Sequence, residues 1–387
     1  MTSLELRHVT VETPRAGLQL DDVSIEVPEA AIVAVCGPAG SGKSALLRVL
    51  VGLDDVTDGE ILLDDVVVNS LDPRDRDVSL VLRDHPLHRH LDVHDNLAFA
   101  SRLHKGVDRA ALAERIDDVA ESLALDGLLD SRVRDLDDTQ RQRVAIGRAL
   151  VRDATVYLFD EVFADQPERV RAHVRSVTTQ WQRDEARTSI FTTSDPNEAL
   201  TLADSVVVLH RGLVHQSGTA QEVYAEPADV FVAAFVGSPA MNLLPARRVE
   251  DQLVTPVATV LVDTELARVL DGRTEVLVGV RPEHWHDAVT PEGAAVRDRV
   301  EFTTRIDDVE WRGGSQLVFV GYEVNDDVEA RLTDLEDALE FDLFQGFCVA
   351  ELSTRERLAP GQSVRLVADR RDLHLFDLES GERLPRR

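Results

Sequence analysis

Short runs of mainly apolar residues alternate with amphipathic segments along roughly the first half of the chain. The apolar runs lie at residues 31–36, 155–159, 189–193 and 205–209. Runs of this length predict strands that are buried on both faces of a sheet. Residues 56–63 predict a turn leading into a strand, and residues 109–124 predict a helix with Ile116, Val119 and Leu123 on one side. This alternation predicts an α/β domain built around a largely parallel sheet.

The pattern changes after residues 235–239, where short β-like runs separated by turns become dominant. These runs lie at residues 275–280, 315–320, 347–352, 363–367 and 373–376. Many short strands joined by turns are typical of an all-β domain, here predicted to be barrel-like. The sequence therefore predicts two domains, residues 1–238 and residues 239–387.

Acidic residues outnumber basic ones by a wide margin. The 387 residues carry 71 Asp and Glu against 42 Lys and Arg, a formal net charge of −29. A field of that sign repels nucleic acid and anionic membrane surfaces, so we expect neither as a partner. Only Lys43 and Lys105 are lysines. This composition suits a salt-rich, halophilic cytoplasm, where charges are screened within roughly 3 Å; an acidic protein from an arginine-biased genome is the alternative.

The two cysteines, Cys36 and Cys348, provide no disulfide framework, as in a reducing compartment. The first residues are neither basic nor followed by an apolar stretch, so no secretory signal is predicted. No apolar run approaches the ~18 residues of a membrane span. We therefore expect a cytoplasmic protein that reaches a membrane only through a partner.

A glycine-rich segment at residues 37–44 has the spacing of a P-loop, G-x-x-x-x-G-K-S. It lies between the predicted strand at 31–36 and a predicted helix at 45–51, whose N-terminus would face phosphates. The candidate nucleotide-binding residues are Gly37, Pro38, Ala39, Gly40, Ser41, Gly42, Lys43, Ser44 and Ala45. In such a loop the lysine reaches the terminal phosphates and the serine hydroxyl binds Mg²⁺. The alternative is a glycine-rich turn that binds nothing.

Two carboxylates, Asp160 and Glu161, directly follow the predicted strand at 155–159. Successive side chains leave a strand in different directions, so one carboxylate can hold Mg²⁺ while the next faces an attacking water. We therefore predict Asp160 as a metal ligand and Glu161 as the catalytic residue. An acidic pair alone is weak evidence for a catalytic site in so acidic a chain. The evidence becomes strong because the same chain also contains the P-loop.

The order of these motifs resembles the ATP-binding subunit of an ABC transporter. The P-loop is followed by QRQRVAIGRAL at residues 140–150 and then by YLFDE at residues 157–161. VGVRPEH at 278–284 and HLFD at 374–377 resemble the C-terminal regulatory domain of sugar-importer (maltose-type) ATPases. The resemblance implies a P-loop (RecA-like) domain with a helical subdomain near residues 84–150, then an OB-like regulatory domain. It also implies ATP, Mg²⁺, dimerisation and integral-membrane permease partners, with an extracellular solute-binding protein acting indirectly.

The chain departs from the family in its signature segment. Asp137, Asp138 and Thr139 stand where the family has serine and two glycines that grip the γ-phosphate bound to the opposite subunit. One charge pair at ~4 Å repels by about 4 kcal/mol at an effective dielectric of 20. The segment is therefore expected to weaken closure on the nucleotide. One of the two aspartates is alternatively a helix cap, and the two interpretations are compatible.

Other family positions have changed as well. Arg83 aligns with the glutamine that senses Mg²⁺ and water, and Ser194 aligns with the histidine that contacts the γ-phosphate. The loop at 162–167 lacks the family's serine–aspartate pattern, and residues 11–15 lack the aromatic residue that stacks on adenine. Ala45 replaces the usual threonine. We expect phosphate binding to be retained and hydrolysis to be weakened, with one hypothesis that Arg83 acts as an arginine finger.

Residues 85–94 are rich in histidine. If this segment is helical, His90 and His94 share a face at a spacing that can bind Zn²⁺. The alternative is an exposed loop, and the resemblance implies that this region contacts the permease.

The sequence leaves three alternative functions open. The first is an ATPase subunit that energises an importer for a sugar or related small solute, as a homodimer or heterodimer. The second is a non-hydrolysing accessory or regulatory subunit that binds nucleotide. The third is a soluble ABC protein unrelated to transport, which the acidic charge and the importer-like β-domain disfavour.

Overall fold

The computed structural model describes residues 2–13, 17–84, 86–102, 108–164, 168–287, 299–353 and 357–384. The chain forms two compact units, Met1–Glu222 and Val223–Arg387. Each has its own sheets and its own hydrophobic core.

A six-stranded sheet forms the centre of the first unit, with the strand order β10-β9-β3-β8-β7-β6. The strands from β9 to β6 are parallel, and β10 pairs antiparallel at one edge. Their bounds are β3 Ile32–Cys36, β6 Val78–Val81, β7 Val156–Asp160, β8 Thr188–Thr193, β9 Ser205–His210 and β10 Leu213–Gly218. Four of these strands confirm the strands predicted from unbroken apolar runs, β3, β7, β8 and β9.

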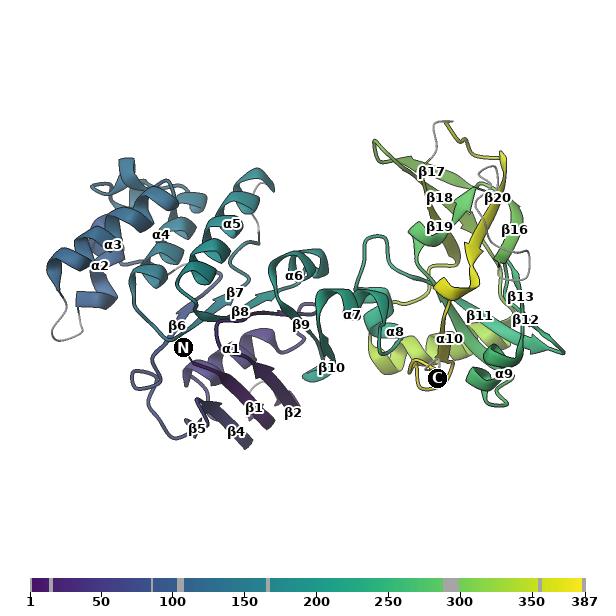
Figure 1. Cartoon of the computed structure of the whole chain (residues 1–387), viewed down its shortest axis with the longest axis horizontal. Coiled ribbons are helices and arrows are strands. Elements are labelled where there is room, and N and C mark those ends of the chain that lie inside the picture. Colours follow the sequence, from purple (N-terminus) through teal and green to yellow (C-terminus); the bar gives the residue numbers. More distant parts are fainter. Residues whose placement is uncertain are drawn as a thin grey trace. The chain divides into compact units, whose positions relative to one another are not determined.

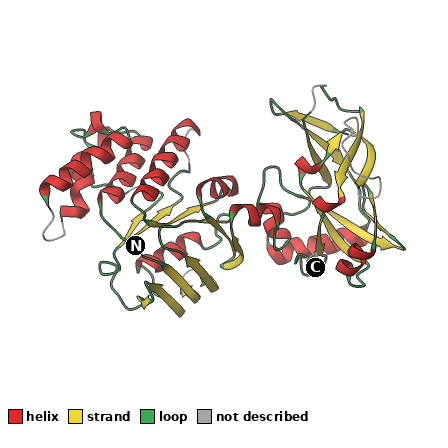
Figure 2. Ribbon diagram, viewed as in Figure 1, coloured by secondary structure: helices red, strands yellow, loops and turns green. Residues whose placement is uncertain are grey.

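The alternation of side chains along β7 shows why these runs are apolar throughout. Val156 and Leu158 enter one core, whereas Tyr157 and Phe159 enter the other. The first core is shared with α1 (Lys43–Val51) and with a four-stranded antiparallel sheet of β1 (Leu4–Thr13), β2 (Gly17–Val27), β4 (Asp58–Leu63) and β5 (Val66–Val67). A strand buried on both faces needs apolar side chains at every position. Figures 1 and 2 show the antiparallel sheet on one side of the parallel one.

The second core lies under helices. It takes side chains from α2 (Val93–Arg102), α3 (Arg109–Ser122), α4 (Asp138–Val151) and α5 (Glu168–Asp184). The predicted helix at 109–124 is confirmed, with Ile116 and Val119 buried inside it and Leu123 buried at its C-cap. Figure 1 shows α2, α3 and α4 gathered together in the part of the chain proposed as a helical subdomain. A further helix, α6 (Pro196–Leu202), follows β8.

The second unit contains three antiparallel sheets around a common core. Their strand orders are β13-β12-β11-β14-β21, β15-β20-β16 and β17-β18-β19. The bounds are β11 Asn242–Val249, β12 Gln252–Val254, β13 Thr259–Leu261, β14 Glu275–Val280, β15 His286–Asp287, β16 Arg299–Arg305, β17 Asp308–Trp311, β18 Gln316–Gly321, β19 Phe347–Leu352, β20 Ser363–Asp369 and β21 His374–Asp377. All five predicted β-runs are therefore strands.

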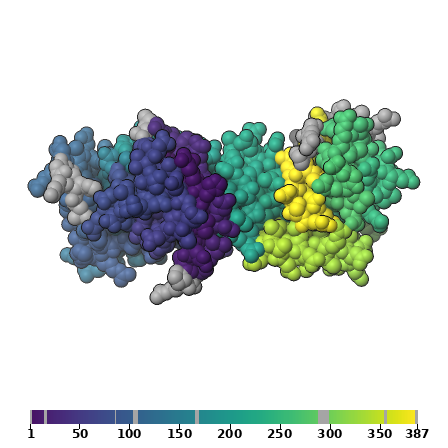
Figure 3. All heavy atoms as spheres, turned by 90° about the horizontal axis from the view of Figure 1, so that it is seen from below, coloured from purple at the N-terminus to yellow at the C-terminus, as the bar shows by residue number. Residues whose placement is uncertain are grey.

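This unit is not built of strands alone. It also holds α8 (Val230–Phe235), α9 (Thr264–Leu270) and α10 (Asp326–Leu339), and α7 (Ala220–Ala225) runs into it. Val230 of α8 and Leu332 and Leu335 of α10 share a core cluster with Phe376 of β21. Figure 3 shows the α10 region (yellow-green) beside the C-terminal strand region (yellow) on one face. The expectation of an all-β domain therefore missed these helices.

The two units divide between Glu222 and Val223, earlier in the chain than the proposed boundary at residue 238. The reason lies in α8, whose Val230, Ala233 and Ala234 are buried in a cluster made only of second-unit residues. Because α8 buries its apolar side chains in the core of the second unit, it belongs to that unit. The boundary at residue 238, which rests on the change to short β-like runs, stays a prediction.

Arg281 is the most unusual buried residue of the second unit. Its side chain is buried, lies 4.0 Å from the Tyr224 ring centre, and donates hydrogen bonds to the carbonyls of Tyr224, Ala233 and Val236. Burial lowers the pKa of Arg281. A guanidinium that satisfies three carbonyls and packs on an aromatic ring joins α7, α8 and the end of β14.

Replacing Arg281 with methionine is expected to lower the free energy of unfolding of the full chain by about 2 kcal/mol. The apolar stem is kept, but buried carbonyl acceptors lose their donor. The matched control is Arg365→Met, because Arg365 pairs with Glu301 on the exposed face of β20 and should change stability by less than about 0.5 kcal/mol. Chemical denaturation of both variants measures the difference, and equal shifts would contradict a structural role for Arg281.

Both cysteines are buried free thiols. Cys36 ends β3, just before the P-loop, and Cys348 lies in β19. Burial raises the pKa of each thiol to about 12. Among the residues described, no helix is long and apolar enough to cross a lipid bilayer.

Candidate functional site

Most of the predicted site residues gather at one edge of the parallel sheet. The strands β3, β8, β7 and β6 are neighbours in that order, and each is followed at its carboxyl end by part of the site. The P-loop follows β3, Ser194 follows β8, Asp160 ends β7 with Glu161 after it, and Arg83 follows β6. In parallel sheets, ligands bind outside the carboxyl ends of the strands. The fold therefore brings together segments that lie more than 100 residues apart in the sequence.

A cavity of ≈ 640 Å³ opens at this edge. Its lining includes the loop from Ala39 to Ala45 together with Arg83, Asp160 and Glu161. It also includes Leu18, Gln19 and Arg211, which the sequence analysis did not identify. These three come from β2 and from the turn between β9 and β10, and no motif marks them. Leu18 is 53% exposed, an apolar surface beside the P-loop.

The glycines of the P-loop are required by close backbone contacts. A Cβ added at Gly37 would lie 1.9 Å from the carbonyl oxygen of Leu209. Gly42 has φ 108° and stands directly before α1, where a Cβ would lie 2.7 Å from the carbonyl oxygen of Gln19. Only glycine fits such positions. The loop is thus held against β2 and β9, and α1 begins with its first N–H groups at the cavity.

Lys43 is buried at the centre of the site, with 4% of its surface exposed. Its Nζ donates to the carbonyl oxygens of Gly37 and Pro38, both at 2.8 Å, and lies 3.4 Å from Oε1 of Glu161. Burial lowers the pKa of Lys43, and the charge of Glu161 opposes that shift. A buried ammonium that is satisfied mainly by backbone carbonyls is well placed to exchange them for phosphate oxygens.

Ser44 and Asp160, the two predicted metal ligands, lie next to each other in the site. The Ser44 hydroxyl donates to Oδ1 of Asp160 at 3.2 Å, and the Thr192 hydroxyl donates to the same atom at 2.8 Å. Mg²⁺ prefers a hydroxyl or carboxylate oxygen together with phosphates and waters. The oxygen atoms of these residues fit a Mg²⁺ ion, which Ser44 and Asp160 would hold. Thr192 is a supporting residue that the sequence analysis did not identify.

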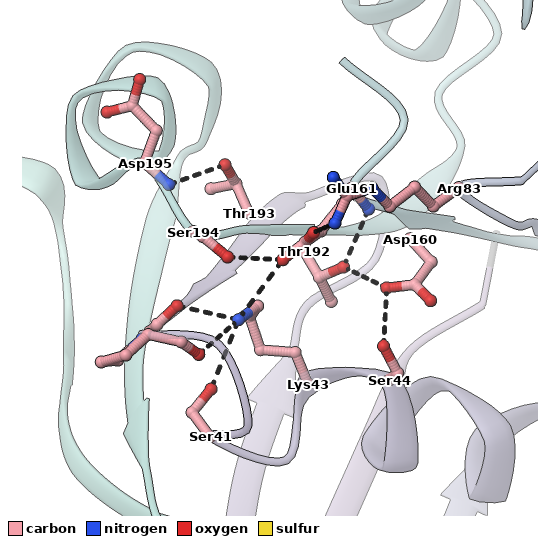
Figure 4. Close-up of polar contacts among 12 residues, drawn as sticks. Ser41, Lys43, Ser44, Arg83, Asp160, Glu161, Thr192, Thr193, Ser194 and Asp195 are labelled. Atoms are coloured by element: carbon pink, nitrogen blue, oxygen red, sulfur yellow. Dashed lines mark hydrogen bonds and ion pairs between the residues drawn. The ribbon is translucent and has the colours of Figure 1, made fainter. Parts of the chain in front are cut away.

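The carboxylate of Glu161 is surrounded by three donors (Figure 4). Ser194 donates from its hydroxyl to Oε1 at 2.5 Å, and Arg83 donates from Nη1 to Oε2 at 3.0 Å. Lys43 is the third, through the same Oε1 that Ser194 contacts. Glu161 has φ 46°, and its N–H is bonded to the carbonyl and hydroxyl oxygens of Thr192. Two of the family positions predicted as changed, Arg83 and Ser194, thus both contact the predicted catalytic carboxylate.

The altered signature residues lie at the start of α4. Asp137 caps the helix: its Oδ1 accepts from the Gln140 N–H at 2.7 Å, and Oε1 of Gln140 accepts from the Asp137 N–H at 2.9 Å. Asp138 is paired with Arg141 at 2.8 Å, and its side chain is 94% exposed. The interpretation of an aspartate as a helix cap is therefore confirmed for Asp137. Thr139 follows in the first turn of the helix.

Some predicted features fall on residues outside the description. Asp165, Gln166 and Pro167 of the loop after Glu161 are among them, as are Pro14 and Arg15 of the segment that lacks the family's aromatic residue. Val162 and Phe163, which begin that loop, are buried in the core under the helices.

The condition under which His90 and His94 would share a helix face is not met, because residues 86–92 are not helical. The helix α2 begins at Val93, so His90 lies in the turn before it. Among the residues described, Asp92, His94 and Asp95 do have ligand atoms within 4.8 Å of one another. Asp92 accepts the N–H of Asp95 at 2.7 Å, as a helix cap does. Asp95 is also paired with Arg102 at 2.6 Å, so this cluster is already satisfied without a metal.

Two family models match the chain. One is described as ABC transporter and matches residues 20–164, and the other is described as MalK OB fold domain and matches residues 237–285. The first covers the P-loop, Asp160 and Glu161. The second covers the first strands of the β-rich unit and includes Arg281.

Relatives match over nearly the whole chain. The trehalose import ATP-binding protein SugC of Mycobacterium tuberculosis is 34% identical over 99% of this chain and 98% of its own length. The sn-glycerol-3-phosphate import ATP-binding protein UgpC of Cereibacter sphaeroides is 36% identical over 99% and 100%. UgpC of Psychromonas ingrahamii is 33% identical over 99% and 96%.

Solved structures share the fold of the first part. The structure of cbiO1 from Clostridium perfringens aligns with a TM-score of 0.53 and 22% identity, covering 58% of this chain and 90% of that one. The ATP-binding cassette MJ0796, bound to ADP and Pi, aligns with a TM-score of 0.52 and 23% identity, covering 56% and 98%.

Proposed function

The chain belongs to the family of ATP-binding proteins of ABC transporters, and from this we propose that it is the ATP-binding subunit of an importer. The proposed cargo is a sugar or a related small solute, because the relatives are named for import of trehalose and of sn-glycerol-3-phosphate. Its proposed partners are integral-membrane permease subunits, which would hold it at the inner face of the cell membrane. A second ATPase subunit completes the dimer, and a solute-binding protein delivers the cargo.

One observation carries this proposal: the P-loop cavity holds a buried ammonium beside a hydroxyl–carboxylate pair. Lys43 supplies the cation for the terminal phosphates, and Ser44 with Asp160 supplies ligands for Mg²⁺. Glu161 is the proposed general base toward the attacking water. We expect these residues to bind Mg·ATP with the phosphates over the N-terminus of α1.

We further propose that hydrolysis is slow. Glu161 is engaged by Arg83, Ser194 and Lys43 rather than free to accept a proton from water. Asp137 and Asp138 add negative charge at the helix that, in the family, meets the nucleotide of the opposite subunit. The chain is thus proposed to bind ATP normally but to hydrolyse it slowly.

The second candidate is an accessory subunit that binds ATP without hydrolysing it. It is favoured by the fact that both halves of a composite site are altered. In a homodimer each site would combine Arg83 and Ser194 of one chain with Asp137 and Asp138 of the other. In a heterodimer with an unaltered partner, each site still inherits one of the two changes.

Steady-state turnover separates these candidates. The purified full chain, with Mg²⁺ in about 2 M KCl, is expected to bind ATP and to hydrolyse it well below the ordinary enzyme rate of about 10 s⁻¹. The same assay with its permease in liposomes tests the importer. Stimulation by permease and solute supports the importer, whereas binding without any turnover in both assays supports the accessory subunit. Absence of ATP binding would refute both.

A further inference from the structure

We propose that the carboxylate of Glu161 occupies the place of a terminal phosphate, held between Lys43 and Arg83, and that Arg83 makes the site select ATP over ADP. The inference rests on the proposed function, since it concerns how the same cavity distinguishes its nucleotides. It assigns Arg83 a role that differs from that of the neutral glutamine expected at its position.

The geometry of one carboxylate between two cations carries the proposal. Lys43 Nζ lies 3.4 Å from Oε1 of Glu161, and Arg83 Nη1 lies 3.0 Å from Oε2. The two cations therefore hold opposite oxygens of a single anionic group. Because the lysine of a P-loop reaches the terminal phosphates, a phosphate that approaches Lys43 also comes close to Arg83. That phosphate would take the position between the two cations that the Glu161 carboxylate fills in this structure.

The charges favour an exchange once a third phosphate is present. A γ-phosphate carries more negative charge than a carboxylate and offers three oxygens, which suit the planar fork of a guanidinium. Arg83 is able to turn toward it, because 56% of its side chain is exposed, whereas the Glu161 side chain is only 16% exposed. Arg83 thus has room to change partner, and Lys43 can exchange its two backbone carbonyl partners in the P-loop for phosphate oxygens.

The exchange has a consequence for Glu161. In the presence of ADP, which has no γ-phosphate, Arg83 keeps the Glu161 carboxylate as its partner. In the presence of ATP, the γ-phosphate takes both cations, and the Ser194 hydroxyl remains as a donor to the Glu161 carboxylate. Arg83 determines nucleotide specificity in this scheme, because it binds the γ-phosphate in place of the Glu161 carboxylate.

The competing interpretation is an ordinary surface ion pair. Exposed pairs contribute about 0–1 kcal/mol to stability and have no consequence for a ligand. Under that interpretation, loss of Arg83 changes the affinities for ATP and ADP by the same factor. The ratio of the two affinities therefore decides between the interpretations, without any measurement of turnover.

The experiment measures binding of Mg·ADP and of a non-hydrolysable β,γ-imido analogue of Mg·ATP to the full chain by calorimetry. Arg83→Ala is expected to lower the affinity for the ATP analogue by about tenfold and to leave the affinity for ADP within about twofold of the wild type. Arg83→Lys, which keeps a charge but loses the fork, should recover part of the difference. Glu161→Gln removes the competing anion. It should raise the ratio of the affinity for the ATP analogue to the affinity for ADP by about tenfold.

Arg211→Ala provides the matched control, because Arg211 lines the same cavity from the turn between β9 and β10. It is expected to change the affinities for both nucleotides by similar factors. The proposal is overturned if Arg83→Ala shifts ATP analogue and ADP equally, or if Glu161→Gln leaves their ratio unchanged. Wild-type chain that binds neither nucleotide would refute the proposed function as well, which is a distinct result.

Discussion

Replacing Lys43 with alanine is expected to lower the affinity for Mg·ATP by roughly 10³-fold, about 4 kcal/mol. Lys43 is the buried cation at the centre of the cavity, held by the carbonyls of Gly37 and Pro38. A charge in a largely dry site interacts with phosphates far more strongly than an exposed one. Its loss also leaves Glu161 with Arg83 as its one remaining cation among the residues described.

Calorimetric titration with Mg·ATP measures this loss. Lys43→Met is the companion variant, because it keeps most of the aliphatic stem and so limits any cavity left inside the fold. Arg48→Ala is the matched control: Arg48 lies on the same helix, α1, but pairs with Asp54 on the surface. Its affinity should stay within about twofold of the wild type. If the Lys43 and Arg48 variants weaken binding equally, the phosphate site lies elsewhere.

Restoring the family's signature, with Asp137→Ser, Asp138→Gly and Thr139→Gly together, is expected to raise ATP turnover by roughly 100-fold. The change removes two negative charges that the opposite subunit's triphosphate would meet. Salt screens part of this repulsion, so the effect should be larger in dilute buffer than in molar KCl. Serine at position 137 still caps α4, which protects the helix from the loss of about 1 kcal/mol that alanine would cause.

Turnover of the full chain, measured across a range of KCl concentrations, tests this restoration. Asp135→Ser is the control, because it removes a nearby negative charge that is outside the signature segment and 62% exposed. It should change turnover less than about twofold. A restored signature with wild-type turnover would assign the slow step to Arg83 and Ser194 instead, and the triple variant combined with Arg83→Gln would then show it.

The framework of the fold was readable because its signals are local. A strand buried on both faces must be apolar throughout, and β3, β7, β8 and β9 are runs of that kind. The P-loop motif was equally local, since its spacing alone places Lys43 and Ser44 at the start of a helix. The carboxyl ends of parallel strands then placed Asp160 and Glu161 beside it.

What the sequence did not reveal depends on tertiary contacts. The contact of Arg83 with Glu161 spans 78 positions. In a chain with 71 Asp and Glu residues, the charge of Arg83 alone does not indicate which carboxylate it meets. Leu18, Gln19 and Arg211 line the cavity only because β2 and the β9–β10 turn pass beside the P-loop. The helix α10 did carry a local signal, an Asn325 cap followed by leucines at helical spacing. It was obscured by the many short strands around it.

The burial of both thiols makes the chain a convenient starting point for chemical labelling. Cys36 and Cys348 are buried, and burial raises the pKa of each to about 12, so little reactive thiolate forms near neutral pH. A single cysteine introduced at an exposed position would then be the one thiol that a maleimide dye modifies. Placed at Asp138, whose side chain is almost fully exposed, such a dye would report the approach of the opposite subunit in real time.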